Sequence, residues 1–210
     1  MEKKFNMDNL IIVGAGGHGK VVADLALSLN KYKEIYFLDD CVKSDYLGIK
    51  VAGKVCDVDR YVHNCEYIVA IGDNLVRKNI TEFLCSKGVK IATLIHKNAV
   101  VSKSANIGVG TVVMAGAIIN ASAKIGNSVI INTGAIVEHD CYVGDFSHVS
   151  VGACLLGTVK SGVNVFLGAK STIKNNLTVC DNVVLGAGTV VVKDICEDGV
   201  YIGIPAYKKR

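Results

Sequence analysis

Two histidines, His139 and His148, lie close together in the segment VEHDCYVGDFSHVSVG and are the best candidates for acid–base chemistry. Histidine is the side chain that exchanges a proton most readily near neutral pH. Glu138 and Asp140 flank His139, and a neighbouring carboxylate can select the tautomer of the ring and support an imidazolium. This arrangement predicts a general base that can deprotonate an amine or a hydroxyl group.

The second half of the chain, which must position these histidines, is built from repeats of six residues. From Ala99 onward the sequence divides into sixteen such units, and the third residue of each is aliphatic except at Ser161. Residues one and three point to the same side of an extended backbone, whereas a helix repeats about every 3.6 residues. Each unit is therefore predicted to be a short strand followed by a corner. Three units close a triangular coil of eighteen residues, and coils stack at roughly 4.8 Å.

The coil length places Gly157 directly over His139, because the two positions differ by eighteen residues. Glycine has no side chain, so its backbone N–H is accessible to an oxyanion that forms beside the imidazole. His148 lies nine residues from His139 and is expected to face away from it within one chain. In a three-fold trimer, however, the two histidines of different chains could converge. The alternative for either histidine is an ordinary surface position.

The first half of the chain alternates strands with helices, which predicts a small Rossmann-like parallel α/β sheet. The expected strands cover residues 10–13, 35–38, 67–71 and 91–94, and the expected helices cover residues 21–29 and 75–88. We predict two domains, residues 1–97 and residues 98–210.

The segment GAGGHGK follows the first expected strand and precedes a helix. Gly14, Gly16 and Gly19 fit the pattern G-x-G-x-x-G, in which backbone amides and a helix N-terminus face phosphate. An NTPase is excluded because Val21 stands where the phosphate loop requires Ser or Thr. About ninety residues are too few for a full dinucleotide domain, so we expect a loop that holds a diphosphate.

Other candidate ligand residues also follow strands, where open parallel sheets bind ligands. The alternative for the GAGGHGK loop is a tight turn that binds no ligand and only allows the following helix to pack closely on the sheet. The expected substrate-binding residues of this half are Gly16, Gly17, His18, Asp39, Asp40, Gly72 and Asn74.

Composition narrows the function classes. No apolar run approaches the roughly 18 residues that span a bilayer, and the N-terminus lacks a signal-peptide core, so a soluble cytoplasmic protein is expected. The net charge of +4 suits an anionic small molecule better than nucleic acid. The eight cysteines form no C-x-x-C pair, which favours reduced thiols. Only His96, His139 and His148 lie on or beside the repeats, too few in register for zinc, so no metal is expected.

The repeats resemble the hexapeptide-repeat acyltransferases, and GAGGHGK together with EHDCYVGDFSHVSVG resembles one subfamily of them. That subfamily comprises sugar acyltransferases such as the bacillosamine-pathway enzyme PglD, the perosamine N-acetyltransferases and the sialic-acid O-acetyltransferases (NeuD). The tail, with the chain's single proline at Pro205, is similar to the usual ending of the family. The resemblance, and not the period of six, implies that the β-helix is left-handed.

The resemblance also implies an activity: acetyl-CoA-dependent N-acetylation of the 4-amino group of a nucleotide-linked sugar, with UDP as the expected nucleotide. It implies direct transfer without a metal, a homotrimer with active sites between chains, and a place in glycan biosynthesis. His139 would be the general base, Asp140 would orient it, and Gly157 would donate its amide N–H to the thioester carbonyl. Asn132 would contact the acceptor amine. The other residues expected to contact acetyl-CoA are His148, Gly168, Ala169 and Ala187.

Three other functions fit parts of the sequence. An O-acetyltransferase of sialic acid or a related sugar would keep the same fold and donor. A non-catalytic trimeric scaffold that binds a nucleotide sugar would not need His139, Asp140 and Gly157 in register. An NAD oxidoreductase is suggested by the glycine loop alone, and the half-sized domain speaks against it.

Overall fold

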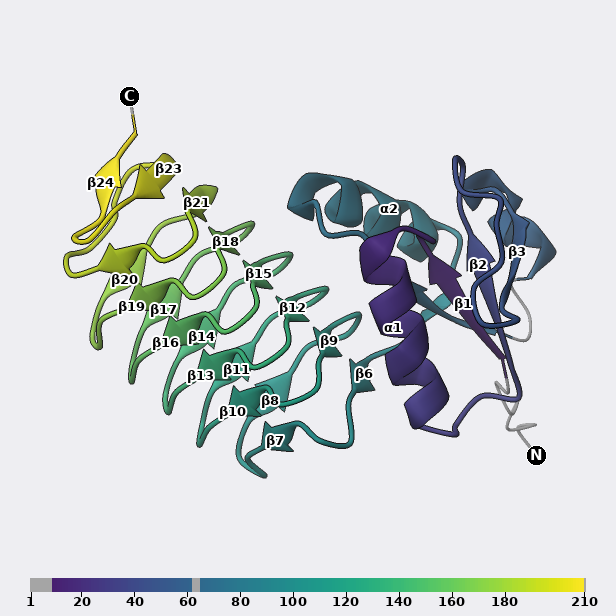
Figure 1. The fold of residues 1–210 in the computed structure, drawn as a ribbon, viewed down its shortest axis with the longest axis horizontal. Coiled ribbons are helices and arrows are strands. Elements are labelled where there is room, and N and C mark those ends of the chain that lie inside the picture. The colour runs from purple at the N-terminus through teal and green to yellow at the C-terminus, as the bar shows by residue number, and fades with distance from the viewer. Residues whose placement is uncertain (1–8, 62–64, 210) are drawn as a thin grey trace. The chain divides into compact units, whose positions relative to one another are not determined.

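The computed structural model describes residues 9–61 and 65–209. These residues divide into two compact units, with the boundary between Leu94 and Ile95. The expected fold class is confirmed: a Rossmann-like unit with a parallel sheet precedes a left-handed parallel β-helix (Figure 1). In the described part of the chain, no helix combines the length and the apolar character needed to cross a membrane.

The N-terminal unit is a five-stranded parallel sheet with the order β3-β2-β1-β4-β5. The chain adds β2 and β3 on one side of β1 and then β4 and β5 on its other side, so the strand order changes direction between β1 and β4. In such sheets the crevice that binds ligands lies at this point, at the carboxyl ends of β1 and β4. The strands are β1 (Asn9–Val13), β2 (Glu34–Leu38), β3 (Lys50–Gly53), β4 (Cys65–Val69) and β5 (Lys90–Ile91). The helices are α1 (Gly17–Ser28), α2 (Asn74–Ser86) and the 3-10 helix η1 (Val55–Arg60).

Two strands differ from the sequence-based expectation. The prediction of one strand at residues 91–94 was wrong, because two strands share this segment. The strand β5 ends at Ile91, and β6 (Leu94–Ile95) belongs to a sheet of the β-helix. The short edge strand β3 was not anticipated. Its four residues are partly or fully exposed, so they lack the apolar alternation that marks a half-buried strand.

Glu66 of β4, next to the edge strand β5, is a buried carboxylate that two lysines neutralise. It is 4% exposed, and it accepts hydrogen bonds from Lys31 Nζ (2.6 Å), Lys90 Nζ (2.7 Å) and Tyr32 OH (2.7 Å). Burial alone would raise the pKa of Glu66, but the bonds from Lys31, Lys90 and Tyr32 outweigh it and bring this pKa down to about 2. Since the folded-state pKa is depressed, the stabilisation is complete above the ordinary pKa of 4.5 and is lost as the pH falls toward 2.

We therefore expect the Glu66→Gln variant to be less stable than wild type at pH 7, by about 2 kcal/mol. The difference should shrink as the pH is lowered from 5 toward 2, because acid protonates Glu66 of the unfolded chain near pH 4.5 and Glu66 of the folded chain only near pH 2. Urea unfolding at each pH measures this. The control is Glu82→Gln, which removes an exposed pair with Lys78 (3.9 Å) and should change little. A difference that does not depend on pH would contradict the assignment.

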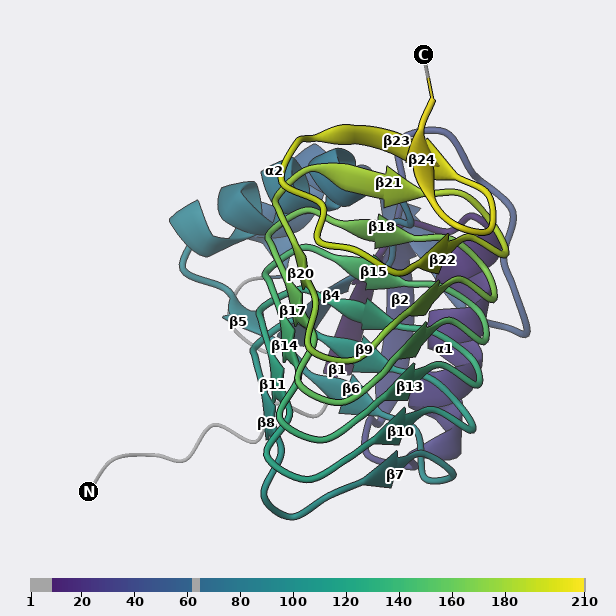
Figure 2. The same cartoon turned by 90° about the vertical axis from the view of Figure 1, so that its left-hand side faces the viewer.

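The C-terminal unit is a prism of three parallel sheets that meet at three edges (Figure 2). We name the sheets after a central strand. The β13 sheet contains β7 (Val100–Val101), β10 (Ile118–Ile119), β13 (Ile136–Val137), β16 (Cys154–Leu155), β19 (Thr172–Ile173) and β22 (Val190–Val191). The β14 sheet contains β8 (Asn106–Ile107), β11 (Lys124–Ile125), β14 (Tyr142–Val143), β17 (Lys160–Ser161) and β20 (Thr178–Val179).

The third sheet, the β15 sheet, closes the prism and carries the C-terminal residues. Besides β6 it contains β9 (Val112–Val113), β12 (Ile130–Ile131), β15 (His148–Val149), β18 (Phe166–Leu167), β21 (Val183–Leu185), β23 (Gly199–Ile202) and the antiparallel β24 (Tyr207–Lys208).

The stacking period of eighteen residues is confirmed by the strand register. Val137 pairs with Leu155, and Leu155 pairs with Ile173, so each strand lies beside the one eighteen residues later. The third residues of the repeats fill the axis of the prism, and most are fully buried. Ser161 occupies the same kind of position and is 1% exposed. Any residue in one corner can thus be placed above its counterpart in the next coil.

Candidate active site

His139 lies in the corner that follows β13 and is held by the residue after it. Asp140 closes the corner with a left-handed backbone (φ +58°), which aspartate tolerates better than most residues. Its Oδ2 lies 2.9 Å from His139 Nδ1. Because a carboxylate only accepts hydrogen bonds, the neutral ring carries its proton on Nδ1. The lone pair of Nε2 is then available to take a proton from a substrate.

Gly157 lies against the imidazole of His139 in the next coil. A β-carbon at this position would be 2.6 Å from His139 Nε2 and 2.7 Å from Cε1, so the ring occupies the space that any side chain would need. Thr158 N donates to His139 O (2.9 Å), which locks the two coils together. Among the residues that the structure describes, the Gly157 N–H donates to no protein group. A candidate base and a candidate oxyanion donor thus meet in one place.

His148 and Asn132 form a second group, on the β15 sheet and the corner after β12. Asn132 Nδ2 lies 3.0 Å from His148 Nε2, and Asn132 Oδ1 accepts from Thr133 N (2.8 Å), which sets the orientation of the amide. The amide NH₂ can only donate, so His148 Nε2 accepts and the ring proton lies on Nδ1. The His148 ring also packs on Phe166 in a T-shaped arrangement, with the ring centroids 5.0 Å apart. Within one chain, His148 thus lies in a strand of the β15 sheet, whereas His139 lies in the corner that follows β13.

The residues expected along the pantetheine arm lie on the same edge of the prism as Asn132. Gly168 is needed for stacking, because a β-carbon there would be 2.5 Å from Leu185 O, and its N–H already donates to that oxygen. Within the described part of the chain, the N–H groups of Ala169 and Ala187 donate to no protein group. These two amides, rather than that of Gly168, are available to a ligand.

The glycines of the GAGGHGK loop divide into two kinds. Gly14 (φ +106°) and Gly19 are structural, since a β-carbon at Gly19 would be 2.0 Å from Gly14 O. A β-carbon at Gly16 or Gly17 would meet nothing within 4 Å. Gly16 caps the N-terminus of α1 without a side-chain hydrogen bond. Packing therefore does not require glycine at 16 and 17, and the open space above them suits an anion.

This division predicts different effects for two substitutions. Gly17→Leu should fill the open space and weaken the binding of a nucleotide diphosphate about tenfold or more while leaving the melting temperature unchanged. Gly19→Ala should lower the melting temperature, because the new methyl group collides with the backbone of Gly14. Calorimetric titration with UDP, combined with thermal unfolding, distinguishes the two. Unchanged UDP affinity in Gly17→Leu would remove the loop from the binding site.

The carboxylates of Asp39 and Asp40 both accept hydrogen bonds from backbone N–H groups of nearby loops. Asp39 accepts from the backbone N–H groups of Ala15 (2.7 Å), Cys41 (2.8 Å) and Val42 (2.7 Å). Burial favours a higher pKa for this carboxyl, but the three N–H bonds outweigh it and hold the pKa below its usual value. Asp40 Oδ1 accepts from Val55 N (3.0 Å). Contact of either carboxylate with a substrate stays a prediction.

Arg77 of α2 is a residue of this region that sequence reasoning missed. It is 1% exposed, and its guanidinium donates to Ile71 O (2.9 Å), Gly72 O (3.2 Å) and Asn74 Oδ1 (2.8 Å). It therefore shapes the loop after β4, where Gly72 and Asn74 were expected to bind substrate. The sequence signal that could have revealed Arg77 is a charged residue on the apolar, buried face of an amphipathic helix.

His18 completes the group at the carboxyl ends of β1 and β4. Burial, and secondarily the positive charge of Arg77, lowers the pKa of His18 to about 4. His18 is therefore neutral at pH 7. Arg77, whose charge acts on His18, is hydrogen-bonded to the loop that bears Gly72 and Asn74.

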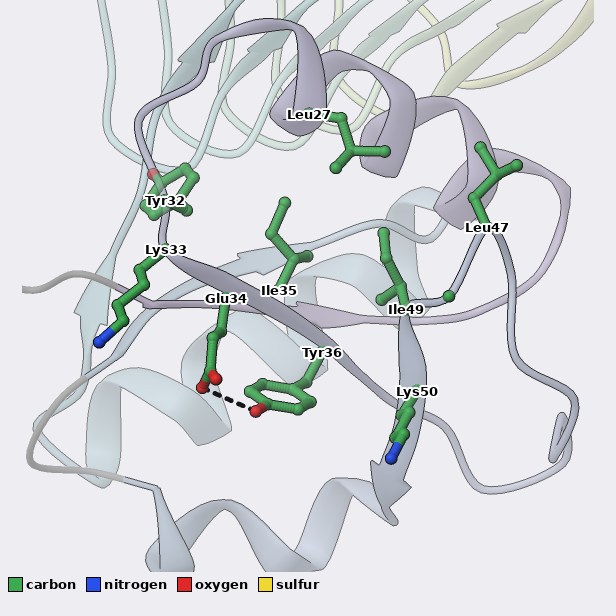
Figure 3. Close-up of a pocket in the computed structure, with 10 residues that line it drawn as sticks. Leu27, Tyr32, Lys33, Glu34, Ile35, Tyr36, Leu47, Ile49 and Lys50 are labelled. Carbon is green, nitrogen blue, oxygen red and sulfur yellow. Dashed lines mark hydrogen bonds between the residues drawn. The ribbon is translucent and has the colours of Figure 1, made fainter.

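A separate cavity of about 430 Å³ lies at the amino ends of β2 and β3 (Figure 3). The side chains of Leu27, Ile35 and Ile49 point toward one another there, while Glu34 and Tyr36, joined by a 2.7 Å hydrogen bond, lie on the other side of the strand. Open parallel sheets bind ligands at the opposite, carboxyl ends of their strands. This cavity is therefore not the candidate nucleotide site.

Comparison with known proteins finds similarity in sequence to a domain family and to a curated enzyme. Residues 9–84 match the model of the PglD N-terminal domain. The chain is also similar to UDP-N-acetylbacillosamine N-acetyltransferase of Bacillus subtilis (strain 168), with 38% identity over 108 residues. That match covers 49% of this chain and 49% of the relative, so it spans about half the length of each.

Several solved structures match almost the whole chain, and two of them contain bound ligands that bear on function. The acetyltransferase domain of PglB from Neisseria gonorrhoeae FA1090, in complex with acetyl coenzyme A, superimposes with a TM-score of 0.94 at 40% identity, covering 96% of this chain and 99% of that one. PerB from Caulobacter crescentus, in complex with CoA and GDP-perosamine, superimposes with a TM-score of 0.86 at 35% identity, covering 96% and 97%. In the described residues of the present chain, no group of three or more His, Cys, Asp or Glu side chains is arranged to hold a metal ion.

Proposed function

Since this chain belongs to the hexapeptide-repeat sugar acyltransferases of the PglD type, we propose that it transfers the acetyl group of acetyl-CoA to the amino group of a nucleotide-linked sugar. The observation that carries the proposal is the contact between His139 and Gly157, with Asp140 bonded to the far side of the ring. A base and an oxyanion donor one coil apart are what aminolysis of a thioester needs.

The reaction follows from this geometry. The neutral amine of the sugar attacks the thioester carbonyl, and the electrons of the C=O bond move to oxygen, where the Gly157 N–H donates to the oxyanion. His139 Nε2 removes the proton from the attacking nitrogen, and Asp140 stabilises the imidazolium that forms. When the intermediate collapses, the C–S bond breaks and CoA leaves as a thiolate, which takes up a proton. No covalent enzyme intermediate and no metal is needed.

We propose that the N-terminal unit binds the nucleotide, with the amides of Gly16 and Gly17 at the diphosphate and the loops of His18 and Asn74 beside it. The bacillosamine relative bears UDP in its name, whereas PerB was solved with GDP-perosamine. We favour UDP because of the sequence match to the former. Thermal-shift screening with UDP-, GDP- and CMP-linked sugars tests this, since a ligand of the native state raises the melting temperature.

We further propose that the chain works as a homotrimer with active sites between chains. The outward residues of the β13 sheet include Val100, Ile118, Ile136 and Cys154, whereas those of the β14 sheet include Lys124 and Lys160. An apolar outer face on a β-sheet calls for a covering partner. In addition, His139 lies on one edge of the prism, and Asn132 and His148 lie elsewhere on it, so only a second chain can bring the two groups together.

Complementation tests this arrangement. Chains with His139→Ala and chains with Asn132→Ala are each expected to be inactive alone. When they are co-expressed, mixed trimers contain some sites with both residues intact, and part of the activity should return. Co-expressed chains that stay inactive, or a monomer in light-scattering chromatography, would contradict a shared site.

The activity itself is tested with acetyl-CoA and a panel of nucleotide-linked amino and hydroxy sugars. Release of the CoA thiol and the gain of one acetyl group by the amino sugar are the expected results. Acetylation of a hydroxy sugar alone would establish the sialic-acid type of O-acetyltransferase instead. Binding of a nucleotide sugar without any binding of acetyl-CoA would establish the scaffold function.

A further inference from the structure

The residue after Gly157 adopts a backbone conformation that its side chain disfavours. Thr158 has φ +61°, in the left-handed region. Among the described residues other than glycine, eleven have positive φ, and Thr158 is the single β-branched one. Equivalent corners carry residues that tolerate this region better, such as Asp140 and Asn176. A strained residue persists only where its surroundings hold it, and such residues concentrate at functional sites.

The surroundings hold the Gly157–Thr158 peptide from both neighbouring coils. Thr158 N donates to His139 O (2.9 Å) in the preceding coil, and Asn176 N in the following coil donates to Gly157 O (3.1 Å). The Thr158 hydroxyl lies within hydrogen-bonding distance of two acceptors, Gly157 O at 2.6 Å and the side-chain oxygen of Asn176. The orientation of this peptide is therefore set by contacts above, below and within the corner.

The preceding peptide, which carries the Gly157 N–H, is held by Cys141. Its carbonyl oxygen, Leu156 O, accepts from Cys141 Sγ at 3.2 Å and from Val159 N at 3.3 Å. Burial raises the pKa of the Cys141 thiol to about 11, so the thiol is protonated and can donate at neutral pH. In a trans peptide the C=O and the N–H point in opposite directions. Because Leu156 O faces the 1% exposed Cys141, the Gly157 N–H faces away from the core of the prism.

We propose that Thr158 and Cys141 are positioning residues for the acetyl-transfer site, which together hold the Gly157 N–H toward the thioester oxygen beside His139. Neither touches the reacting atoms. The proposal rests on the proposed function, and it assigns a role to a buried thiol and a strained threonine that acid–base chemistry does not use.

The tests of Thr158 compare stability with turnover. Glycine adopts positive φ without strain, so Thr158→Gly should melt at or above the wild-type temperature while the peptide loses its hydroxyl contact. We expect kcat to fall about tenfold, a smaller loss than that of an oxyanion donor itself. The pH profile of kcat should keep its shape, because His139 is untouched. Thr158→Ser keeps the hydroxyl and should stay within about threefold of wild type.

The matched control is Asn164→Gly, at a left-handed corner (φ +58°) on another edge of the prism, which should leave kcat unchanged. For Cys141, the alanine variant removes the donor and should lower kcat about tenfold, and the serine variant supplies an O–H donor and should restore most of it. Thr158→Gly or Cys141→Ala with wild-type kcat would overturn the role of that residue. Parallel losses of melting temperature and kcat would also overturn it, because they indicate a structural role alone.

Hydrogen exchange, which does not depend on catalysis, tests the positioning role separately from the proposed acetyltransferase function. The amide of residue 158 is bonded to His139 O, so its hydrogen exchange reports how firmly the corner is held. Faster exchange at this amide in Thr158→Gly and Cys141→Ala than in wild type supports the positioning role even if the wild-type chain acetylates no sugar in the panel. Unchanged exchange in both variants would overturn the positioning role even if the wild-type chain is an active acetyltransferase.

Discussion

Replacing His139 with alanine is expected to lower kcat by a factor of about 10² or more, the usual loss when a general base is removed. The physical reason is the tautomer that Asp140 imposes: its Oδ2, 2.9 Å from Nδ1, leaves Nε2 as the acceptor for the amine proton. The variant should still bind acetyl-CoA and the nucleotide sugar, because alanine removes neither the Gly157 N–H nor the glycine loop. The measurement is steady-state release of the CoA thiol, with calorimetry for the two ligands.

The control for this substitution is His96→Ala, which removes a histidine of the same unit whose Nδ1 accepts from Asn98 N and which has no role in the proposed reaction. It should keep wild-type activity. The kcat of Asp140→Asn should lie between those of His96→Ala and His139→Ala, because an amide cannot stabilise an imidazolium as a carboxylate does. If His139→Ala turned over at a rate near wild type, His139 would not be the base.

Replacing Gly157 with alanine should cause a loss of comparable size, roughly 10²–10³ in kcat, the scale for losing one oxyanion donor. The added methyl group would lie 2.6 Å from His139 Nε2, so the imidazole must move away and the N–H becomes shielded. Both catalytic groups are disturbed at once. The KM for acetyl-CoA should rise as well, because the thioester no longer fits beside the ring.

The fold should survive this change, and a second glycine shows why. At Gly157 the obstacle is a side chain at the surface, whereas at Gly144 a β-carbon would lie 2.4 Å from the backbone of Gly162 in the next coil. Gly144→Ala should therefore lower the melting temperature sharply, and Gly157→Ala should not. A Gly157→Ala variant that keeps both kcat and the KM for acetyl-CoA would refute the placement of the thioester at this contact.

The β-helix was predictable because its repeat converts sequence separation into spatial proximity. Aliphatic residues at every sixth position specify the buried axis, and eighteen residues return the chain to the same corner. The contact between His139 and Gly157 follows from that period alone. The hand of the coil does not, since the same pattern of buried residues serves either hand, and here it came from family resemblance.

The N-terminal unit was predictable in outline only. The order of helices and strands and the glycine loop follow from local patterns, and so does the placement of loops at the carboxyl ends of strands. The burial of Arg77, its bonds to Ile71, Gly72 and Asn74, and the use of Asp39 to clasp the amides of Ala15, Cys41 and Val42 do not. No repeat relates these residues, so their contacts depend on the path of each loop.

The sequence by itself determined the period of the prism, the residues that fill its axis and the pairing of a histidine with a glycine one coil away. Only the tertiary structure decided which ring nitrogen of His139 is free, which partner His148 has, and how Thr158 and Cys141 hold the peptides around Gly157. The physical reason is that stacking depends on residue spacing, which a sequence displays directly. Hydrogen-bond direction depends on side-chain and peptide orientation, which exist only once the coils are packed.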